Sequence, residues 1–487
     1  MQRPGTVFVL LVLILSACSS EAQELPNQTE RLDVQGALAR ARSSREWPKS
    51  TSLDTLQTIY RSRAFSPLWA RAGSLTSQAS AIARLLQAAE EYGLQSQDYV
   101  SVPASLPERP PAAQPTLKGA RLERLADYDI RLTATLVRFL TDVHFGRVDP
   151  RRAGFDLQVA RPSLDFDLLL EQLSSAEDAR SVIATIEPQF YHYVLLEQAL
   201  ARYRLLQRGR RSSEHATAVY ATRIRKIELT LERWRWLPAF DSPPIIVNIP
   251  QFRLFAFRST ADRKAEIMQM DVIVGRTYPK LHTPVFAADL KYVIFRPYWD
   301  VPASITRTEM IPAMRARPDY LRAQHLEIIR GWGDSATIVD PSPQAIQELE
   351  AGRLRLRQQP GPDNALGLVK FMLPNPYNVY LHATPAQRLF SRSRRAFSHG
   401  CIRVSDPVAL AAYVLRDTPE GWTPGAVAKA MQASHSSRVD LAKPIRVMIL
   451  YGTALALEDG STSFFPDIYG EDRKLERLLG LPRVVTP

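Results

Sequence analysis

The stretch FSHGCIRV at residues 397–404 decides which fold and chemistry are expected, and a second stretch, YLHATP at residues 380–385, precedes it. Each stretch contains a histidine, and the first also places a cysteine directly after a glycine. Cysteine attacks a carbonyl as its thiolate, and a nearby imidazole that accepts the thiol proton supplies that form. The sequence therefore predicts Cys401 as a nucleophile and His382 as its base.

The first stretch is similar to the S/T-H-G-C-h-R signature of the L,D-transpeptidase family, where h is an apolar residue, and the second to the H-x-T-P element that precedes it. Every signature position is filled, in order. Weaker similarity to the larger periplasmic branch of the family covers most of residues 52 to 475. It includes residues 231–236, 248–250, 283–286, 297–299 and 361–371. The resemblance implies a cysteine acyltransferase that needs no metal and no cofactor.

Several neighbours receive supporting roles. The resemblance implies that a backbone carbonyl, that of Ala383 or an adjacent residue, orients the imidazole. A glycine beside the nucleophile lets the chain present amides to an oxyanion, so Gly400 and the Cys401 amide are the predicted donors. Tyr380 lies two residues before the base and shares its face on an extended strand. It is predicted to donate a further hydrogen bond, with ordinary core packing as the alternative.

The signature contributes three more candidates. Arg403 lies two residues after the nucleophile and is predicted to fix the loop or to bind a substrate carboxylate in a bidentate contact, with a structural salt bridge as the alternative. Ser398 and His399 are grouped as supporting residues, and no proton transfer is assigned to His399. A zinc site at His382, His399 and Cys401 is disfavoured because no second nearby cysteine and no H-E-x-x-H helix completes a ligand set.

The N-terminus predicts export and a lipid anchor. Arg3 precedes an apolar run at residues 7–15 that is too short to span a bilayer but suits a secretory signal. The run ends in LSAC at residues 15–18, which resembles a bacterial lipobox. Residues 1–17 are therefore predicted to be a signal peptide, with Cys18 as the lipidated first residue of the mature protein. An ordinary signal peptide is the alternative.

The two cysteines of the chain support this assignment. Lipidation of Cys18 leaves Cys401 without a disulfide partner, and a lone thiol in an oxidising compartment is either buried and inert or retained because it reacts. Ser19, rather than Asp, follows the lipobox and resembles an outer-membrane address. The predicted location is the periplasm, lipid-anchored, at the outer membrane of a Gram-negative bacterium.

Hydrophobic periodicity organises the remaining chain. Polar residues 18–51 are predicted to be a tether, and helical spacing predicts a scaffold module over residues 52–222. A period of two then predicts a mainly β domain over residues 223–475, with a helical lid insertion at residues 303–366 and a tail at residues 476–487. The resemblance implies that this domain is the L,D-transpeptidase catalytic domain. The expected fold class is α+β. Strands are predicted at residues 245–249, 252–257, 268–274, 292–295, 368–373, 379–381 and 445–457.

Composition sets broad limits. A chain of 487 residues with 45% hydrophobic content is long enough for two or more folded domains. Its formal net charge is +12, but the basic residues are scattered, and the predicted export separates the protein from the usual nucleic-acid partners. No nucleic-acid partner is therefore expected.

Thiol chemistry in the periplasm points to peptidoglycan stem peptides as partners. By resemblance, Cys401 attacks the third stem residue of a tetrapeptide donor and expels the terminal D-Ala, and the side-chain amine of a diamino-acid acceptor then gives a 3→3 crosslink. Water, as in an L,D-carboxypeptidase, or attachment or release of an envelope protein are alternatives for the second step. A scaffold that binds peptidoglycan without turnover is the alternative from another class. Family members are acylated by carbapenems, so the same sensitivity is expected here.

Overall fold

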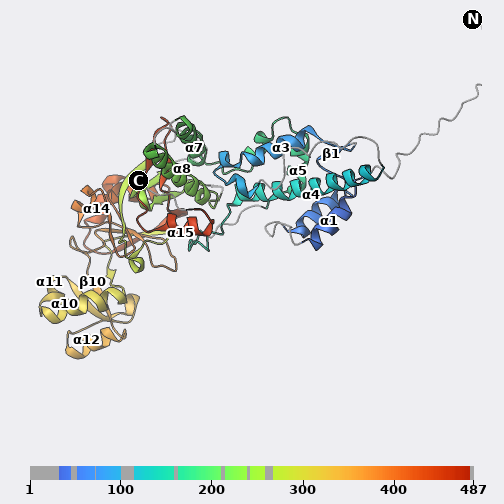
Figure 1. Cartoon of the computed structure of the whole chain (residues 1–487). Coiled ribbons are helices and arrows are strands. Elements are labelled where there is room, and N and C mark those ends of the chain that lie inside the picture. The colour runs from blue at the N-terminus through green and yellow to red at the C-terminus, as the bar shows by residue number, and fades with distance from the viewer. Residues whose placement is uncertain are drawn as a thin grey trace, which may run out of the picture.

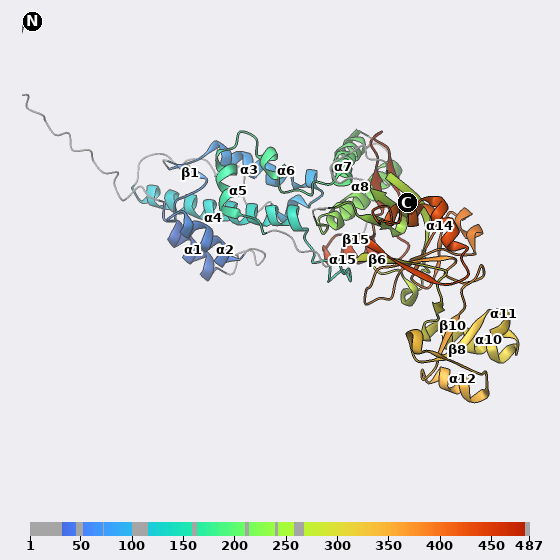
Figure 2. The same cartoon turned by 180° about the vertical axis from the view of Figure 1, so that it is seen from behind.

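The computed structural model describes residues 32–44, 52–71, 73–99, 115–157, 163–209, 214–238, 242–257 and 267–482. The predicted signal peptide and Cys18 lie outside these ranges. A helical module and a small lid lie at opposite ends of the molecule, with a sheet domain between them (Figures 1 and 2). The expected α+β class, a helical N-terminal part before a mainly β domain, is confirmed. Within the described ranges, no helix combines the length and apolar character needed to cross a bilayer.

The helical module packs around one long helix, α4. Its elements are α1 (Val34–Ser43), α2 (Leu53–Ser62), β1 (Ala70–Arg71), β2 (Ser74–Leu75), α3 (Ser77–Gln87), η2 (Ala89–Tyr92), η3 (Ser96–Asp98), α4 (Pro115–Phe145), α5 (Phe166–Ser175) and α6 (Ala179–Ala184). The buried Asp129 of α4 accepts hydrogen bonds from the Tyr60 hydroxyl at 2.6 Å and from the Trp69 amide at 2.6 Å. These bonds satisfy a carboxylate that would otherwise be costly to bury.

Helix α1 corrects the predicted tether. It lies inside residues 18–51 and follows its N-cap residue Asp33, whose side chain accepts a hydrogen bond from the Gly36 amide at 2.7 Å. Its buried residues are Val34, Ala37, Leu38 and Ala41. This spacing gives α1 a short apolar stripe that packs against α4. The polar residues on the other faces of α1 make the stripe hard to recognise in the sequence.

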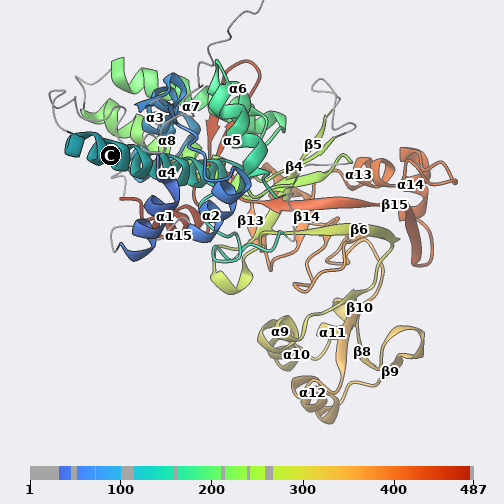
Figure 3. The ribbon, with the colours of Figure 1, turned by 90° about the vertical axis from the view of Figure 1, so that its right-hand side faces the viewer.

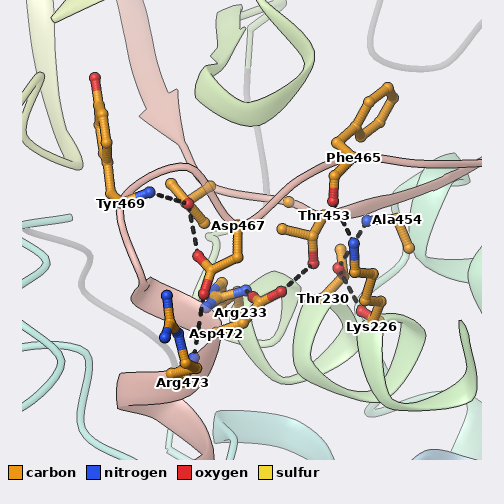
Figure 4. Close-up of polar contacts among 12 residues, drawn as sticks. Lys226, Thr230, Arg233, Thr453, Ala454, Phe465, Asp467, Tyr469, Asp472 and Arg473 are labelled. Atoms are coloured by element: carbon orange, nitrogen blue, oxygen red, sulfur yellow. Dashed lines mark hydrogen bonds and ion pairs between the residues drawn. The ribbon is translucent and has the colours of Figure 1, made fainter. Parts of the chain in front are cut away.

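The predicted boundary between residues 222 and 223 falls inside a continuous helix. The helices concerned are α7 (Tyr191–Gly209), α8 (Glu214–Trp234) and α15 (Glu471–Leu478). Both α7 and α8 share the hydrophobic core of the sheet domain. Arg233 of α8 donates to Asp472 of α15 at 2.6 Å, and Lys226 donates to the Phe465 carbonyl at 2.5 Å (Figure 4). Helix α8 therefore belongs with the sheet domain.

A nine-stranded sheet in the order β13-β5-β14-β12-β11-β6-β15-β3-β4 forms the centre of this domain, and an additional pairing of β4 with β5 closes it on itself. Its strands are β3 (Ile245–Asn248), β4 (Arg253–Phe257), β5 (Ile267–Gly275), β6 (Phe286–Phe295), β11 (Val369–Met372), β12 (Leu381–His382), β13 (Ala396–Ser398), β14 (Ile402–Val404) and β15 (Ser437–Leu450). Short elements complete the domain: η4 (Ile249–Gln251), η5 (Pro279–Leu281), η8 (Gln387–Ser391), α13 (Pro407–Val414), α14 (Pro424–Met431), β16 (Ala454–Ala456) and β17 (Thr462–Phe464). Each predicted strand overlaps an observed one, and β15 begins eight residues before the predicted start at residue 445.

The lid, defined here as residues 299–358, leaves the sheet domain at the end of β6 (Figure 3). It contains β7 (Trp299–Asp300), α9 (Ala303–Ile305), η6 (Thr306–Met310), α10 (Ile311–Ala316), α11 (Tyr320–Ala323), β8 (Leu326–Arg330), η7 (Gly333–Ser335), β9 (Thr337–Val339), α12 (Pro343–Glu350) and β10 (Arg355–Gln358). Four strands form its own sheet in the order β7-β10-β8-β9, over a separate hydrophobic core.

The prediction of a helical lid is thus only partly right. Residues 326–330 form a strand because they pair with β10, and Glu327 lies opposite Arg357 with a 2.8 Å ion pair between them. A short apolar run of this kind does not distinguish a strand from a buried helix until its pairing partner is known.

Candidate active site

The register of three adjacent strands gathers the predicted site. Strand β12 pairs in parallel with β14 and antiparallel with β11. His382 consequently lies opposite Arg403 on one side and opposite Lys370 on the other. Because side chains alternate along a strand, Tyr380 shares the face of His382, and Cys401 shares the face of Arg403. Five polar side chains therefore meet on one face of the sheet.

His382 is buried, and its tautomer follows from its partner. Its Nδ1 lies 2.6 Å from the carbonyl oxygen of Ala383, which can only accept, so Nδ1 carries the proton and Nε2 retains a lone pair. The Ala383 carbonyl thus lies where the sequence places the orienting acceptor. Burial, and after it the charge of Arg403, lowers the pKa of His382 to about 3. The imidazole is neutral at neutral pH.

Cys401 is half-buried and lies beside Tyr380. Its thiol donates to the Asn378 carbonyl oxygen at 3.7 Å. Burial raises the pKa of Cys401, while hydrogen bonds from the Tyr380 backbone and side chain act in the opposite direction. Among the described residues no hydrogen bond joins Sγ to His382. Strand spacings put their Cα atoms roughly 8 Å apart as diagonal neighbours, a looser arrangement that is common before substrate binds.

The loop before the nucleophile is braced by two hydroxyl groups. Gly400 has φ of 119°, a conformation that favours glycine. The Thr283 hydroxyl donates to the Gly400 carbonyl at 2.7 Å and accepts from the Gly275 amide at 2.8 Å. The Ser398 hydroxyl donates to the Cys401 carbonyl at 2.5 Å and accepts from the Gly400 amide at 3.1 Å. These bonds fix the backbone that presents the sulfur.

This bracing changes the predicted oxyanion donors. The Gly400 amide is occupied by Ser398, so it is not available as predicted. The Cys401 amide has no acceptor within the described part of the chain. Together with the Tyr380 hydroxyl, which bonds the Cys401 side chain, it forms the donor pair beside the sulfur.

Arg403 departs from the predicted loop contact. It forms no hydrogen bond or ion pair with any described residue, and its Nε is buried without an acceptor. Neither the structural salt bridge nor a contact that fixes the loop is present. The guanidinium instead lies beside His382 and Cys401, on whose pKa values its charge acts.

Comparisons with known proteins agree with this arrangement. Residues 243–424 match the family model of the L,D-transpeptidase catalytic domain, and residues 54–200 match that of a scaffold domain. Residues 243–424 are therefore an L,D-transpeptidase catalytic domain by similarity. It is 32% identical over 251 residues to a Haemophilus influenzae protein named "Putative L,D-transpeptidase". That alignment covers 51% of this chain and 48% of the relative, so the chain spans about half the length of the curated protein it matches.

The lid touches the signature itself. His399 Nε2 lies 2.6 Å from Glu309 Oε1, and Glu309 belongs to η6 of the lid. The predicted support of the loop by His399 is therefore a contact between the loop and the insertion. No group of three His, Cys, Asp or Glu side chains suited to a metal ion occurs in the described ranges.

Three residues at the site were not identified from the sequence. Lys370 interrupts an otherwise apolar strand, Val369–Met372, and that interruption was the available signal. Thr283 belongs to a segment noted only for its resemblance, since no local pattern connects it to Gly400. Asn378 has φ of 53°, and nothing in its neighbours indicates that its carbonyl faces the thiol.

Proposed function

We propose that this protein forms 3→3 crosslinks in peptidoglycan through a thioester on Cys401. In the first step Sγ bonds to the carbonyl carbon of the third residue of a tetrapeptide stem. The thiol proton passes to His382 and then to the leaving nitrogen as the amide bond breaks, which releases D-Ala. In the second step the side-chain amine of a diamino acid on another stem attacks the thioester. An amide forms, the thiol is restored, and atoms and charges balance.

One observation carries the proposal: the Ala383 carbonyl holds Nδ1 as a donor and so leaves Nε2 of a neutral imidazole as the acceptor on the face that Cys401 shares. A buried imidazole with a lowered pKa is not already protonated, so it can take the thiol proton as attack proceeds. The raised pKa of Cys401 favours transfer during attack over a preformed ion pair. Carbapenems, which are acylating agents with a strained amide, are expected to acylate the same sulfur.

The second step admits other acceptors. Water in place of the amine gives an L,D-carboxypeptidase, and a protein amine gives attachment of an envelope protein. The 3→3 crosslink is preferred because a scaffold domain accompanies the catalytic domain, and a second stem needs more docking surface than water does. We also propose that Cys18 is lipidated and holds the protein at the outer membrane from the periplasmic side. Loss of lipid labelling in Cys18→Ser is the expected result.

The test uses the purified protein and disaccharide-tetrapeptide muropeptides. Mass spectrometry should detect 3→3 dimers and free D-Ala with the wild type, and neither product with Cys401→Ala. His382→Gln should reduce the rate by about 100-fold or more, as expected for loss of a general base. His435→Gln, which changes an exposed histidine, serves as the matched control and should retain full activity.

Products then discriminate between the acceptors. Tripeptide monomers with no dimers would identify water as the acceptor and replace crosslinking by carboxypeptidase activity. Dimers formed by a folded Cys401→Ala variant would overturn the thioester.

A further inference from the structure

Two half-buried cations flank the sulfur, and neither has a carboxylate partner among the described residues. Lys370 and Arg403 lie on either side of His382 in the sheet, on the face that holds Cys401. Within the described residues, neither has a carboxylate oxygen within 4.0 Å. Asp300, whose charge acts on Lys370, is itself paired with Arg355 at 2.7 Å.

Such an arrangement is costly in the free protein. A half-buried cation that lacks a counter-ion loses part of its hydration without replacement, and the Nε atom of Arg403 is itself buried without an acceptor. Lys370 is only partly compensated by the ring of Tyr380, whose centroid lies 3.9 Å from Nζ. The two charges therefore form a site that can bind an anionic group of a ligand from outside the chain.

We propose that Lys370, together with Arg403, binds the terminal carboxylate of the donor stem, on the residue that leaves. This inference rests on the proposed function. Only a nitrogen and a Cα separate that carboxylate from the scissile carbonyl carbon, so the two carbons lie about 3–4 Å apart. A cation that reads the carboxylate must therefore lie next to the sulfur.

The positions of both residues meet this requirement. Arg403, in β14, is two residues after Cys401, about 6.6 Å between Cα atoms, and Lys370 lies two strands away with the same two-residue offset, roughly 12 Å from Cys401. Long side chains cover these distances, and the charges of both residues act on Cys401.

The consequence is selection by chain length. An additional residue moves the carboxylate about 3.6 Å further from the scissile bond, beyond the two cations. Lys370 thereby becomes a specificity residue that favours donors with one residue after the scissile bond over donors with two.

The experiment compares two donors that differ in one group: a tetrapeptide stem with a free terminal carboxylate and the same stem with a terminal carboxamide. The ratio of their kcat/KM values cancels any effect on the nucleophile, because both are attacked by the same sulfur. Wild type should prefer the carboxylate by about tenfold or more, as expected for a charge-assisted contact. Lys370→Met should lower that preference by about tenfold, mainly through the carboxylate donor and mainly in KM.

Two further variants sharpen the result. Lys370→Arg keeps the charge and should keep most of the preference. Lys291→Met, which changes an exposed lysine on the adjacent strand β6, should leave the ratio unchanged.

The outcomes separate the two proposals. Equal loss on both donors in Lys370→Met would show that Lys370 acts on the thiolate or on Tyr380, and it would overturn the carboxylate site while leaving the thioester mechanism intact. If wild type releases neither D-Ala from the carboxylate donor nor D-alaninamide from the carboxamide donor, the proposed function itself fails, and the inference that rests on it fails as well.

Discussion

His382 and Arg403 are cross-strand partners in the parallel pair of β12 and β14, so an imidazole and a guanidinium share one face of the sheet. Burial lowers the pKa of His382 to about 3, and the adjacent positive charge acts in the same direction. The imidazole is therefore a neutral base that is held in one tautomer by the Ala383 carbonyl. Catalytic readiness and a cost in stability at low pH both follow from this arrangement.

The first prediction concerns stability at acidic pH. A histidine has a pKa near 6.5 in the unfolded chain and about 3 here, so the unfolded state binds the additional proton between these values. The stability conferred by the neutral imidazole is complete above pH 6.5 and is lost as pH falls toward 3. From pH 6.5 to pH 5 the loss is about 2 kcal/mol.

Urea unfolding at pH 7.5 and pH 5 measures this loss, with His382→Gln as the reference. The free energy of unfolding of wild type should fall by about 2 kcal/mol more than that of the variant. Other groups with perturbed pKa values, such as the buried His192, are present in both proteins and cancel in the difference. Parallel losses in the two proteins would contradict the neutral, buried state of His382.

The sequence could predict the reactive pair but not the whole site, for a physical reason. The signature fixes residue types over a few positions, and period-two alternation places Tyr380 and His382 on one face without any knowledge of the fold. Lys370 joins them only through the pairing of β11 with β12, which is a property of the folded sheet. Likewise, the short apolar run of β8 is compatible with a strand or a buried helix, and only its pairing with β10 identifies it as a strand.

The second prediction concerns the contact between lid and loop. Glu309→Gln removes the charge that faces His399 at 2.6 Å. Because a partly exposed pair contributes at most about 1 kcal/mol, the melting temperature should hardly change. Amide hydrogen exchange in residues 303–316 should become faster, and KM for the donor should rise. Glu350→Gln is the control, since its ion pair with Arg315 lies within the lid. Equal exchange in both variants would argue against a role of His399 in holding the lid.

The third prediction concerns the brace behind the nucleophile. Thr283→Val keeps the shape of the side chain but removes the hydroxyl between the Gly275 amide and the Gly400 carbonyl. Two hydrogen bonds at about 1 kcal/mol each should be lost, and kcat should fall because the backbone at Gly400 loses a restraint. Thr277→Val, at an exposed position in the same connection, should stay within about 0.5 kcal/mol of wild type. Unchanged kcat in a destabilised Thr283→Val would limit this threonine to a structural role.

The last prediction concerns the buried ion pair that ties α8 to α15 (Figure 4). The side chains of Arg233 and Asp472 are 2% and 9% exposed, so removal of one charge strands the other. Within the described part of the chain, Arg233→Met leaves the Asp472 carboxylate with only the Thr453 hydroxyl, 2.8 Å away, and should cost about 3–5 kcal/mol.

The double variant Arg233→Met/Asp472→Leu should recover most of that loss, because two apolar side chains need no counter-ion. The net contribution of the wild-type ion pair to the free energy of unfolding is itself limited, because Nε and Nη2 of Arg233 are buried without acceptors. Urea unfolding of the wild type, both single variants and the double variant forms a complete mutant cycle. If the free energy of unfolding of a single variant stays within about 1 kcal/mol of wild type, water or a local rearrangement solvates the remaining charge. The link between α8 and α15 would then rest on their apolar contacts.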